Sequence, residues 1–462
     1  MSNDKNSPRL ASDKLGTQPI WKLLINLAVP SAVGYSFIVL DAVLNTAFVA
    51  QLGEKQLASV SFAYPMQYLL MAALVVGFMD GFVVSVSGTL AKRDSALVSK
   101  TIGNAILLQI VMSALCLLFG LFGVPAIISA TISDAEMIRY GVDYLSVVYM
   151  LAFVPIMQYT AEGLLLVTGQ SRLRMICECV MAAISVTLAP IMIFGLFGMP
   201  RMEVIGAAMS TVMGQAAACL LAVFFNVKYN KEVKLYLRSF IPSRKIMVEI
   251  LRIAIPSVAQ YSMTSIGTYG LNMVLLTFGS VAVAIHIAFF RVQTLIIAEL
   301  DAISDAIKVV LPYNLNDINS SQERRNRRVR ATIYISVCYG GVVTGVGFLV
   351  FQFFPAWLVG FFNPTEDMLN AGVTAFRILS MQLIFFAFTI PISAMFRAFK
   401  HTNYGVWLTF IRQLVLLVPL AYLLSLTDSL NITLWALSVS NLVASVIGVV
   451  LLQRILRKQD VV

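Results

Sequence analysis

Two stretches of this chain carry the same pattern, LAVPSAVGYS at residues 27–36 and IAIPSVAQYS at residues 253–262. Pro30 of the first aligns with Pro256 of the second at an offset of 226 residues, and Gly53 aligns with Gly279 at the same offset. Further prolines pair in the same order at offsets of 230, 236 and 229 residues: Pro125 with Pro355, Pro155 with Pro391, and Pro190 with Pro419. Ordered pairs of this kind indicate an internal duplication.

Both copies consist of long apolar runs. Hydrophobic residues make up 59% of the 462 residues, charged residues only 12%, and the mean hydropathy is +0.85. A soluble domain carries about 25% charged residues, so this chain has too little polar surface to be coated by water. About 20 apolar helical residues cross the roughly 30 Å core of a bilayer, whereas barrel strands alternate in period two. The composition therefore predicts an all-α membrane protein.

Twelve membrane-spanning helices can be marked along the sequence. Six crossings separate the two copies, so the copies point in the same direction, and we expect two parallel six-helix repeats around a central cleft. The expected spans are residues 21–45, 57–88, 99–122, 138–167, 175–197, 204–226, 247–276, 281–312, 329–353, 367–396, 403–425 and 431–453.

Lysine and arginine residues gather in every second loop, which places those loops in the cytosol. Because the net charge of +10 is spread in this way, it does not indicate a nucleic-acid partner. We expect a multi-pass protein of a bacterial or archaeal cytoplasmic membrane, with both termini cytosolic. Its predicted parts are an N-terminal cytosolic tail (1–20), an N-terminal six-helix lobe (21–227), a cytosolic linker (228–246), a C-terminal six-helix lobe (247–453) and a C-terminal cytosolic tail (454–462).

An ionisable side chain inside a bilayer costs about 2.5–3.5 kcal/mol, so each one requires an explanation. Asp41 lies about 28 Å along the first helix from Lys22 at about 1.5 Å per residue, and Asn45 lies one turn further on the same face. No basic residue is within helical reach of Asp41, which favours a site that binds a proton or a cation. The alternatives are an acid that reaches water, or one that pairs with a base on another helix. Asp41 aligns with Gly267, so the second copy lacks the acid.

A second set of intramembrane charges lies near the cytosolic ends of the helices. Asp80 aligns with Asp305, and Asp301, Asp305 and Lys308 share one helical stripe on which Lys308 can neutralise an acid. Glu162, near the end of the fourth span, is similarly placed. These residues are either components of an inner gate or a structural ion-pair cluster.

Pro30 and Pro256 fall inside the first and seventh helices, where the missing backbone hydrogen bond permits a kink. The kink is either a hinge that couples Asp41 to the shape of the cleft or a static bend.

Several classes of function lack their signatures. The two histidines, His286 and His401, lie on different predicted helices, so no metal site is expected. No Walker-type loop occurs, which excludes ATP as the energy source of this chain alone, and no HExxH or GxSxG motif suggests an enzyme. We expect no cofactor besides a coupling ion, small organic substrates, a lipid bilayer as surroundings, and a monomer.

The chain resembles the multidrug and toxic compound extrusion (MATE) family. The resemblance is carried by the A-V-P start of the first helix, Asp41, the turn at Gly53 and four longer strings, and it extends over essentially the whole sequence. The strings are TGQSRLRM at 168–175, AAISVTLAPIMIFGL at 182–196 with IGAAMSTVMGQ at 205–215, and FIRQLVLLVPLAYLL at 410–424. The resemblance implies an antiporter that exports organic, often cationic and lipophilic, compounds in exchange for H+ or Na+. It also implies that Asp41 belongs to the cation site of the N-terminal lobe.

The sequence departs from the family at one point. Many prokaryotic members carry Asn-x-x-x-Asp-Pro on the fifth helix, where this chain has Ser185 and Ala189 before Pro190. A hard cation requires several oxygen ligands, and only neutral donors such as Ser185, Thr187 and Asn45 remain beside Asp41. We therefore expect H+ coupling rather than Na+ coupling. The alternatives are a lipid-linked saccharide flippase of the same superfamily, or a membrane receptor or scaffold that transports nothing.

Overall fold

The computed structural model describes all residues except 1–12, 54, 57–58, 61–62, 64–65, 68–74, 132–133, 231–235, 319, 363–365 and 460–462. The described part is helical and contains no strand. Its first half comprises α1 Asp13–Thr17, α2 Ile20–Ala50, α4 Gly77–Leu90, α5 Ser95–Leu118, the π-helix η2 Phe119–Gly123, α6 Val124–Thr131, α7 Ala135–Met150, α8 Phe153–Val167, α9 Ser171–Phe194, the 3-10 helix η3 Leu196–Gly198 and α10 Glu203–Tyr229. Its second half comprises the 3-10 helix η4 Leu237–Phe240, α11 Arg244–Leu276, α12 Ser280–Asn316, α13 Gln322–Phe353, α14 Pro355–Gly360, α15 Glu366–Ala398, α16 Thr402–Phe410, the π-helix η5 Ile411–Leu417, α17 Val418–Ser425 and α18 Leu430–Lys458.

Ten helices in the described part are long and apolar enough to cross a membrane, and an eleventh span results if α7 and α8 are counted together. Most of residues 57–74 in the expected span at 57–88 lie outside the described residues, which contain the end of the span as α4. Large apolar side chains are exposed along the spans, with Phe122 and Leu220 each 72% exposed. An apolar surface of this extent suits lipid and not water. The prediction of an all-α membrane protein is confirmed.

The fourth span, expected at 138–167, consists of two helices. It breaks at Leu151 and Ala152, and α7 and α8 meet there at an angle of 42°. Pro155 has no backbone N–H to donate to the carbonyl of Leu151, so the helical ladder is interrupted one turn before the proline.

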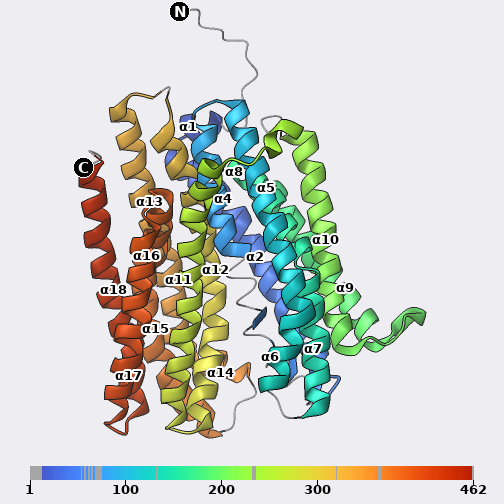
Figure 1. Cartoon of the computed structure of the whole chain (residues 1–462). Helices are drawn as coiled ribbons and strands as arrows, with labels where there is room; N and C mark the ends of the chain where they lie inside the picture. The colour runs from blue at the N-terminus through green and yellow to red at the C-terminus, as the bar shows by residue number, and fades with distance from the viewer. Residues whose placement is uncertain are drawn as a thin grey trace, which may run out of the picture. The chain divides into compact units, whose positions relative to one another are not determined.

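The chain divides into two compact units, residues 1–251 with 312–319 and residues 252–311 with 320–462. In the first unit α2 packs on α9, and α9 and α10 lie side by side (Figure 1). The α9 and α10 backbones approach closely at two glycines of α10. A Cβ added at Gly206 would lie 2.7 Å from the backbone of Met192, and one at Gly214 would lie 2.6 Å from the carbonyl oxygen of Met181. Small residues allow this approach, as is common between membrane helices.

The segment before α11 is held against α5. The Asn104 side chain accepts a hydrogen bond from the backbone N–H of Ser243 (2.6 Å) and donates one to the carbonyl of Ile241 (3.2 Å). The adjacent Gly103 provides the space, since a Cβ there would overlap the backbone carbonyl of Ser239. The described part of the expected linker at 228–246 is therefore docked on the first unit.

Helix α7 begins at a capped turn. Asp134 accepts hydrogen bonds from the backbone N–H groups of Glu136 (2.9 Å) and Met137 (3.0 Å), and the ammonium group of Lys55 lies 3.4 Å from its carboxylate. The bonds from Met137 and Glu136, together with Lys55, hold the pKa of Asp134 below its ordinary value.

In the second unit α13 packs on α15 and α15 packs on α18 (Figure 1). Its core contains three mutually contacting rings of Phe289, Phe351 and Phe376, with centroids 4.7 to 5.7 Å apart. The two cores are thus each built from helices of one repeat, apart from the start of α11 and the end of α12, which join the first unit.

We predict that Gly206→Val destabilises the protein, because the new side chain meets backbone atoms that cannot rotate away. Overpacking of this kind typically costs about 1–3 kcal/mol, and thermal unfolding in detergent measures it. Gly341→Val in α13 is the matched control, since a Cβ at Gly341 meets nothing within 4 Å. Equal unfolding temperatures for the two variants would contradict the close approach of α9 and α10.

Candidate functional site

Asp41 lies inside α2 with only 5% of its surface exposed. Its carboxyl group faces the hydroxyl of Ser185 on α9, without a hydrogen bond of standard geometry, and its Oδ1 has no hydrogen-bond partner. Among the described residues no Lys, Arg or His forms an ion pair with it. Asp41 is therefore a buried carboxyl group without a counter-charge.

The other residues expected beside Asp41 are arranged differently. The Asn45 amide donates to the hydroxyl of Thr211 on α10 (3.0 Å). Thr187 is exposed, and its hydroxyl donates to the carbonyl of Ala183 in its own helix (2.7 Å). The structure thus brings Ser185 to Asp41 but directs Asn45 and Thr187 elsewhere.

The position at which many relatives carry an acid is apolar here. Ala189 is completely buried in a cluster with Val49, Ile193 and Ala207. Within the described residues, no group of three or more His, Cys, Asp or Glu side chains is placed to hold a metal ion.

A charge pair lies on the same helix as Ser185. Arg174 and Glu178 are both completely buried, and Arg174 Nε lies 3.1 Å from Glu178 Oε1. Arg174 Nη2 donates to the hydroxyl of Tyr35 on α2 (2.9 Å), and the guanidinium carbon lies 5.1 Å from the centre of that ring. Gly34 makes room for the pair, because a Cβ there would overlap the Glu178 carboxylate.

Glu162 on α8 adds a second acid to this region and is also completely buried. Its Oε1 accepts a hydrogen bond from Gln158 (2.9 Å), while its Oε2 has no hydrogen-bond partner. Arg174 is close enough to stabilise its carboxylate electrostatically. We call Tyr35, Gln158, Glu162, Arg174 and Glu178 the N-terminal charge cluster. It holds two acids for one arginine.

Sequence reasoning missed most of this cluster. The loop pattern predicts that Arg174 is a cytosolic loop residue, yet Arg174 is buried in α9. The spacing of four residues places Arg174 and Glu178 on one face of an apolar helix. The cluster includes Glu162, which was expected near an inner gate.

The second unit repeats the arrangement with different side chains. Arg397, also expected in a loop, is buried and lies 5.5 Å from the centre of the Tyr261 ring. It donates to Gln260 Oε1 (2.7 Å) and to the Ser257 hydroxyl (3.2 Å). Gln260 in turn donates to the hydroxyl of Thr409 (3.1 Å). Tyr35 and Tyr261 occupy the same place in the two quoted repeats, so a buried arginine contacts the equivalent tyrosine in each unit.

The remaining expected gate residues are spread over both units. Asp80 is completely buried in α4 of the first unit. In α12 of the second unit, Lys308 forms a buried ion pair with Asp305 (2.6 Å), whereas Asp301 is exposed. Pro30 and Pro256 lie within the continuous helices α2 and α11.

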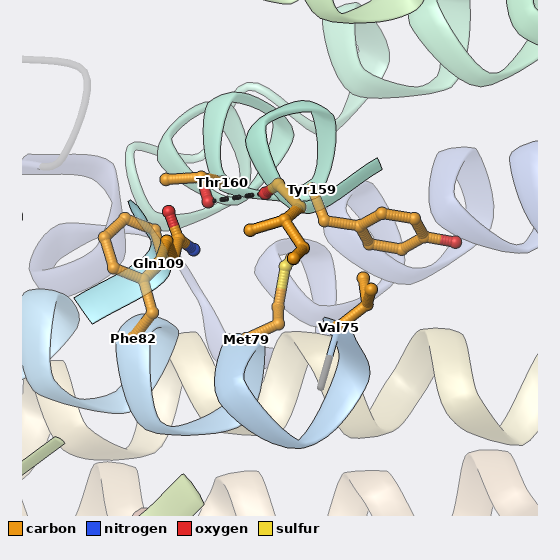
Figure 2. Close-up of a pocket in the computed structure, with 7 residues that line it drawn as sticks. Val75, Met79, Phe82, Gln109, Tyr159 and Thr160 are labelled. Carbon is orange, nitrogen blue, oxygen red and sulfur yellow. Dashed lines mark hydrogen bonds between the residues drawn. The ribbon is translucent and has the colours of Figure 1, made fainter. Parts of the chain in front are cut away.

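A small pocket in the first unit is lined by Val75, Met79, Phe82, Gln109, Ile156, Tyr159 and Thr160 (Figure 2). The Thr160 hydroxyl donates to the carbonyl of Ile156 (2.8 Å), and the carbonyl oxygen of Gln109 has no partner. The space is too narrow for a water molecule, so in this conformation it does not hold a ligand.

Two repeated bundles of apolar helices, one of which buries unneutralised carboxyl groups, define a polytopic membrane transporter. The MatE family model matches the chain twice, over residues 30–191 and over residues 256–423. The chain belongs to the MATE family. The two matches begin at Pro30 and Pro256, the pair that aligns the repeats, so both the resemblance and the duplication are confirmed.

Known relatives are distant but extend over nearly the full length. The chain is 21% identical to a FAD transporter of Shewanella oneidensis over 95% of both chains. It is 22% identical to the multidrug export protein MepA of Staphylococcus haemolyticus over 92% of both chains. A solved structure of a multidrug resistance MATE family transporter in an outward-facing conformation has a TM-score of 0.88 and 22% identity, covering 97% of this chain and 99% of that one. At this identity the structural likeness establishes the fold.

We predict that Arg174→Met strongly destabilises the first unit, because Glu178 is left buried without its partner. Removing one member of a buried pair costs about 3–5 kcal/mol, whereas replacing both with apolar residues is often neutral. Thermal unfolding of Arg174→Met, Glu178→Leu and the double variant gives the coupling between them. Arg172→Met, on an exposed position of the same helix, is the control, and strict additivity of the two single effects would argue against the pair.

Proposed function

We propose that this protein is a secondary antiporter that exports organic compounds by alternating access in exchange for H+, with Asp41 as the group that binds the proton. Membership of a family of multidrug efflux transporters supports export. The observation that carries the coupling is the burial of Asp41 without a counter-charge.

An ionised carboxylate in such surroundings is costly, so Asp41 favours a state in which a proton or a cation neutralises it. A lipophilic cationic substrate and a proton compete for the same charge. Entry of a proton from outside then releases the substrate, and loss of the proton to the cytosol restores the carboxylate. This competition produces exchange without requiring any other ionisable group.

The oxygen donors near Asp41 favour H+ over Na+. Among the described residues, the hydroxyl of Ser185 faces the Asp41 carboxyl group, whereas the Asn45 amide is bonded to Thr211 and Thr187 is exposed. The position of Ala189 is apolar. A proton needs one carboxylate oxygen, whereas a hard metal cation needs several oxygen ligands.

In this proposal both termini are cytosolic, as the loop charges indicate. Pro30 lies three turns before Asp41 in α2, where its missing hydrogen bond allows the helix to bend when Asp41 is neutralised.

We predict that Asp41→Asn abolishes efflux driven by a pH gradient, because the amide cannot exchange a proton. The measurement is drug efflux from proteoliposomes with an acidic exterior, normalised to the amount of reconstituted protein. Asp143→Asn, which changes a partly exposed acid in α7, should leave efflux unchanged. Full activity of the Asp41 variant would end the proposal.

The coupling ion can be tested on the unmodified protein. We expect an imposed pH gradient to drive efflux and an imposed Na+ gradient at equal pH to drive none. Efflux driven by the Na+ gradient alone would mean that the site near Asp41 binds Na+ and that H+ coupling is wrong.

A second candidate is export of a flavin nucleotide, an anionic solute. The similarity to a FAD transporter over 95% of the chain suggests it. The specific observation in its favour is Arg412, a cation in the second unit whose hydrogen-bond partner is a neutral amide.

A further inference from the structure

The basic groups within the apolar helices of the described residues differ in how they are neutralised. Arg174 is paired with Glu178 and Lys308 with Asp305. Arg412 lies within the apolar span Thr402–Ser425 and forms no ion pair with any described acid. Its Nη1 donates to Oδ1 of Asn441 on α18 at 2.9 Å.

The amide that receives Arg412 belongs to a chain of neutral amides. Asn441 donates to Gln382 on α15 at 3.5 Å, and Gln382 donates to Gln293 on α12 at 3.2 Å. All three amides are nearly completely buried. In each amide the side-chain oxygen accepts a hydrogen bond from the neighbour nearer Arg412, so the negative ends of the amide dipoles point towards the cation. Neutral dipoles leave the positive charge itself uncompensated.

The backbone at Arg412 is unusual as well. Residues 411–417 form the π-helix η5, a wider turn of a kind often found at functional sites. Successive side chains are directed to different helices there. Arg412 reaches Asn441 on α18, whereas Gln413 packs against Gly267 on α11. Arg412 is also only partly buried, so part of its side chain is accessible at the surface of the unit.

A guanidinium group has five N–H donors in a planar fork that matches carboxylate and phosphate oxygens. The hydrogen bond to Asn441 engages one nitrogen of Arg412 and leaves the other donors for a ligand. A cation placed in the membrane without an internal acid is most readily stabilised by an anion that arrives from outside the chain.

We propose that the second unit contains a binding site for the carboxylate or phosphate group of an organic solute, with Arg412 as the residue that binds the anion. The site goes beyond the proposed proton exchange, because it does not involve Asp41 and binding can be measured without transport. The same chemistry would also accept the phosphate of an acidic lipid headgroup.

The test compares two fluorescent probes that differ by one phosphate ester, riboflavin and flavin mononucleotide, on the full-length protein in detergent. Fluorescence anisotropy should show that the phosphate ester binds about tenfold or more tightly than riboflavin, the strength expected of a charge-assisted bond. Arg412→Gln should reduce its affinity to that of riboflavin, and Arg412→Lys should recover part of it. Arg377→Gln, a change at an exposed arginine of α15, should bind as the unmodified protein does.

A lipid arm separates the two sources of the anion. The unfolding temperature of the unmodified protein and of Arg412→Gln is measured in nanodiscs of phosphatidylcholine, with and without phosphatidylglycerol. Selective stabilisation of the unmodified protein by phosphatidylglycerol supports the site and identifies a headgroup as its occupant. If neither flavin mononucleotide nor phosphatidylglycerol distinguishes Arg412→Gln from the unmodified protein, the proposal is overturned. Full efflux by Asp41→Asn together with weakened anion binding by Arg412→Gln would retain the site while ending the proton-exchange proposal.

Discussion

The contact between α2 and α9 determines the chemistry of the first unit. At one level Gly34 of α2 makes room for Glu178 of α9, which allows a fully buried carboxylate to reach Arg174. Farther along α2, Asp41 meets the small Ser185 of α9. At each level one helix contributes the ionisable side chain and the other contributes the space. Two membrane helices can pack closely and still bury acids only if large and small residues alternate between them in this way.

The second unit keeps the contact and exchanges the roles. Where α2 has Gly34, α11 has Gln260, which contacts Gly405 and bonds to Thr409. Glu178 and Thr409 are each the eighth residue of their helix, counted from Ser171 and Thr402, so the two residues hold equivalent positions in α9 and α16.

The same exchange occurs where the first unit has Asp41. Gly267 aligns with Asp41, and the space left by its missing side chain is filled by Gln413. Neutral amides and hydroxyls have thus replaced carboxylates in the second unit. Asp41 in one copy and Arg412 in the other are charged groups without an ion-pair partner among the described residues. The two copies share a backbone arrangement and differ in the charges they hold at these positions.

The architecture could be predicted from the sequence for two reasons. A lipid bilayer requires long apolar helices, and prolines occur at equivalent positions in the two repeats. The lone acid at position 41 could be recognised for a similar reason, since no base is near it along the helix. Arg174 and Arg397 could not be placed, because a basic residue just before or after a long apolar run looks the same whether it faces water or a buried partner. Whether Thr187 or Ser185 faces Asp41 depends on the rotation of α9, which is set by contacts with other helices. Pro155 lies inside the expected span at 138–167, but the sequence does not show whether such a proline stays within a continuous helix, as Pro30 does, or breaks it.

The complementary shapes at Gly34 and Gln260 limit how this fold can vary. A side chain cannot be enlarged on α2 unless one on α9 is reduced at the same level, so a single helix is not an independent part. Transplanting α11 into the first copy would bring a glutamine against a buried carboxylate and leave a void opposite a glycine farther along. The smallest interchangeable piece of this transporter is therefore a pair of facing helices, and either half can acquire new polarity only through paired substitutions.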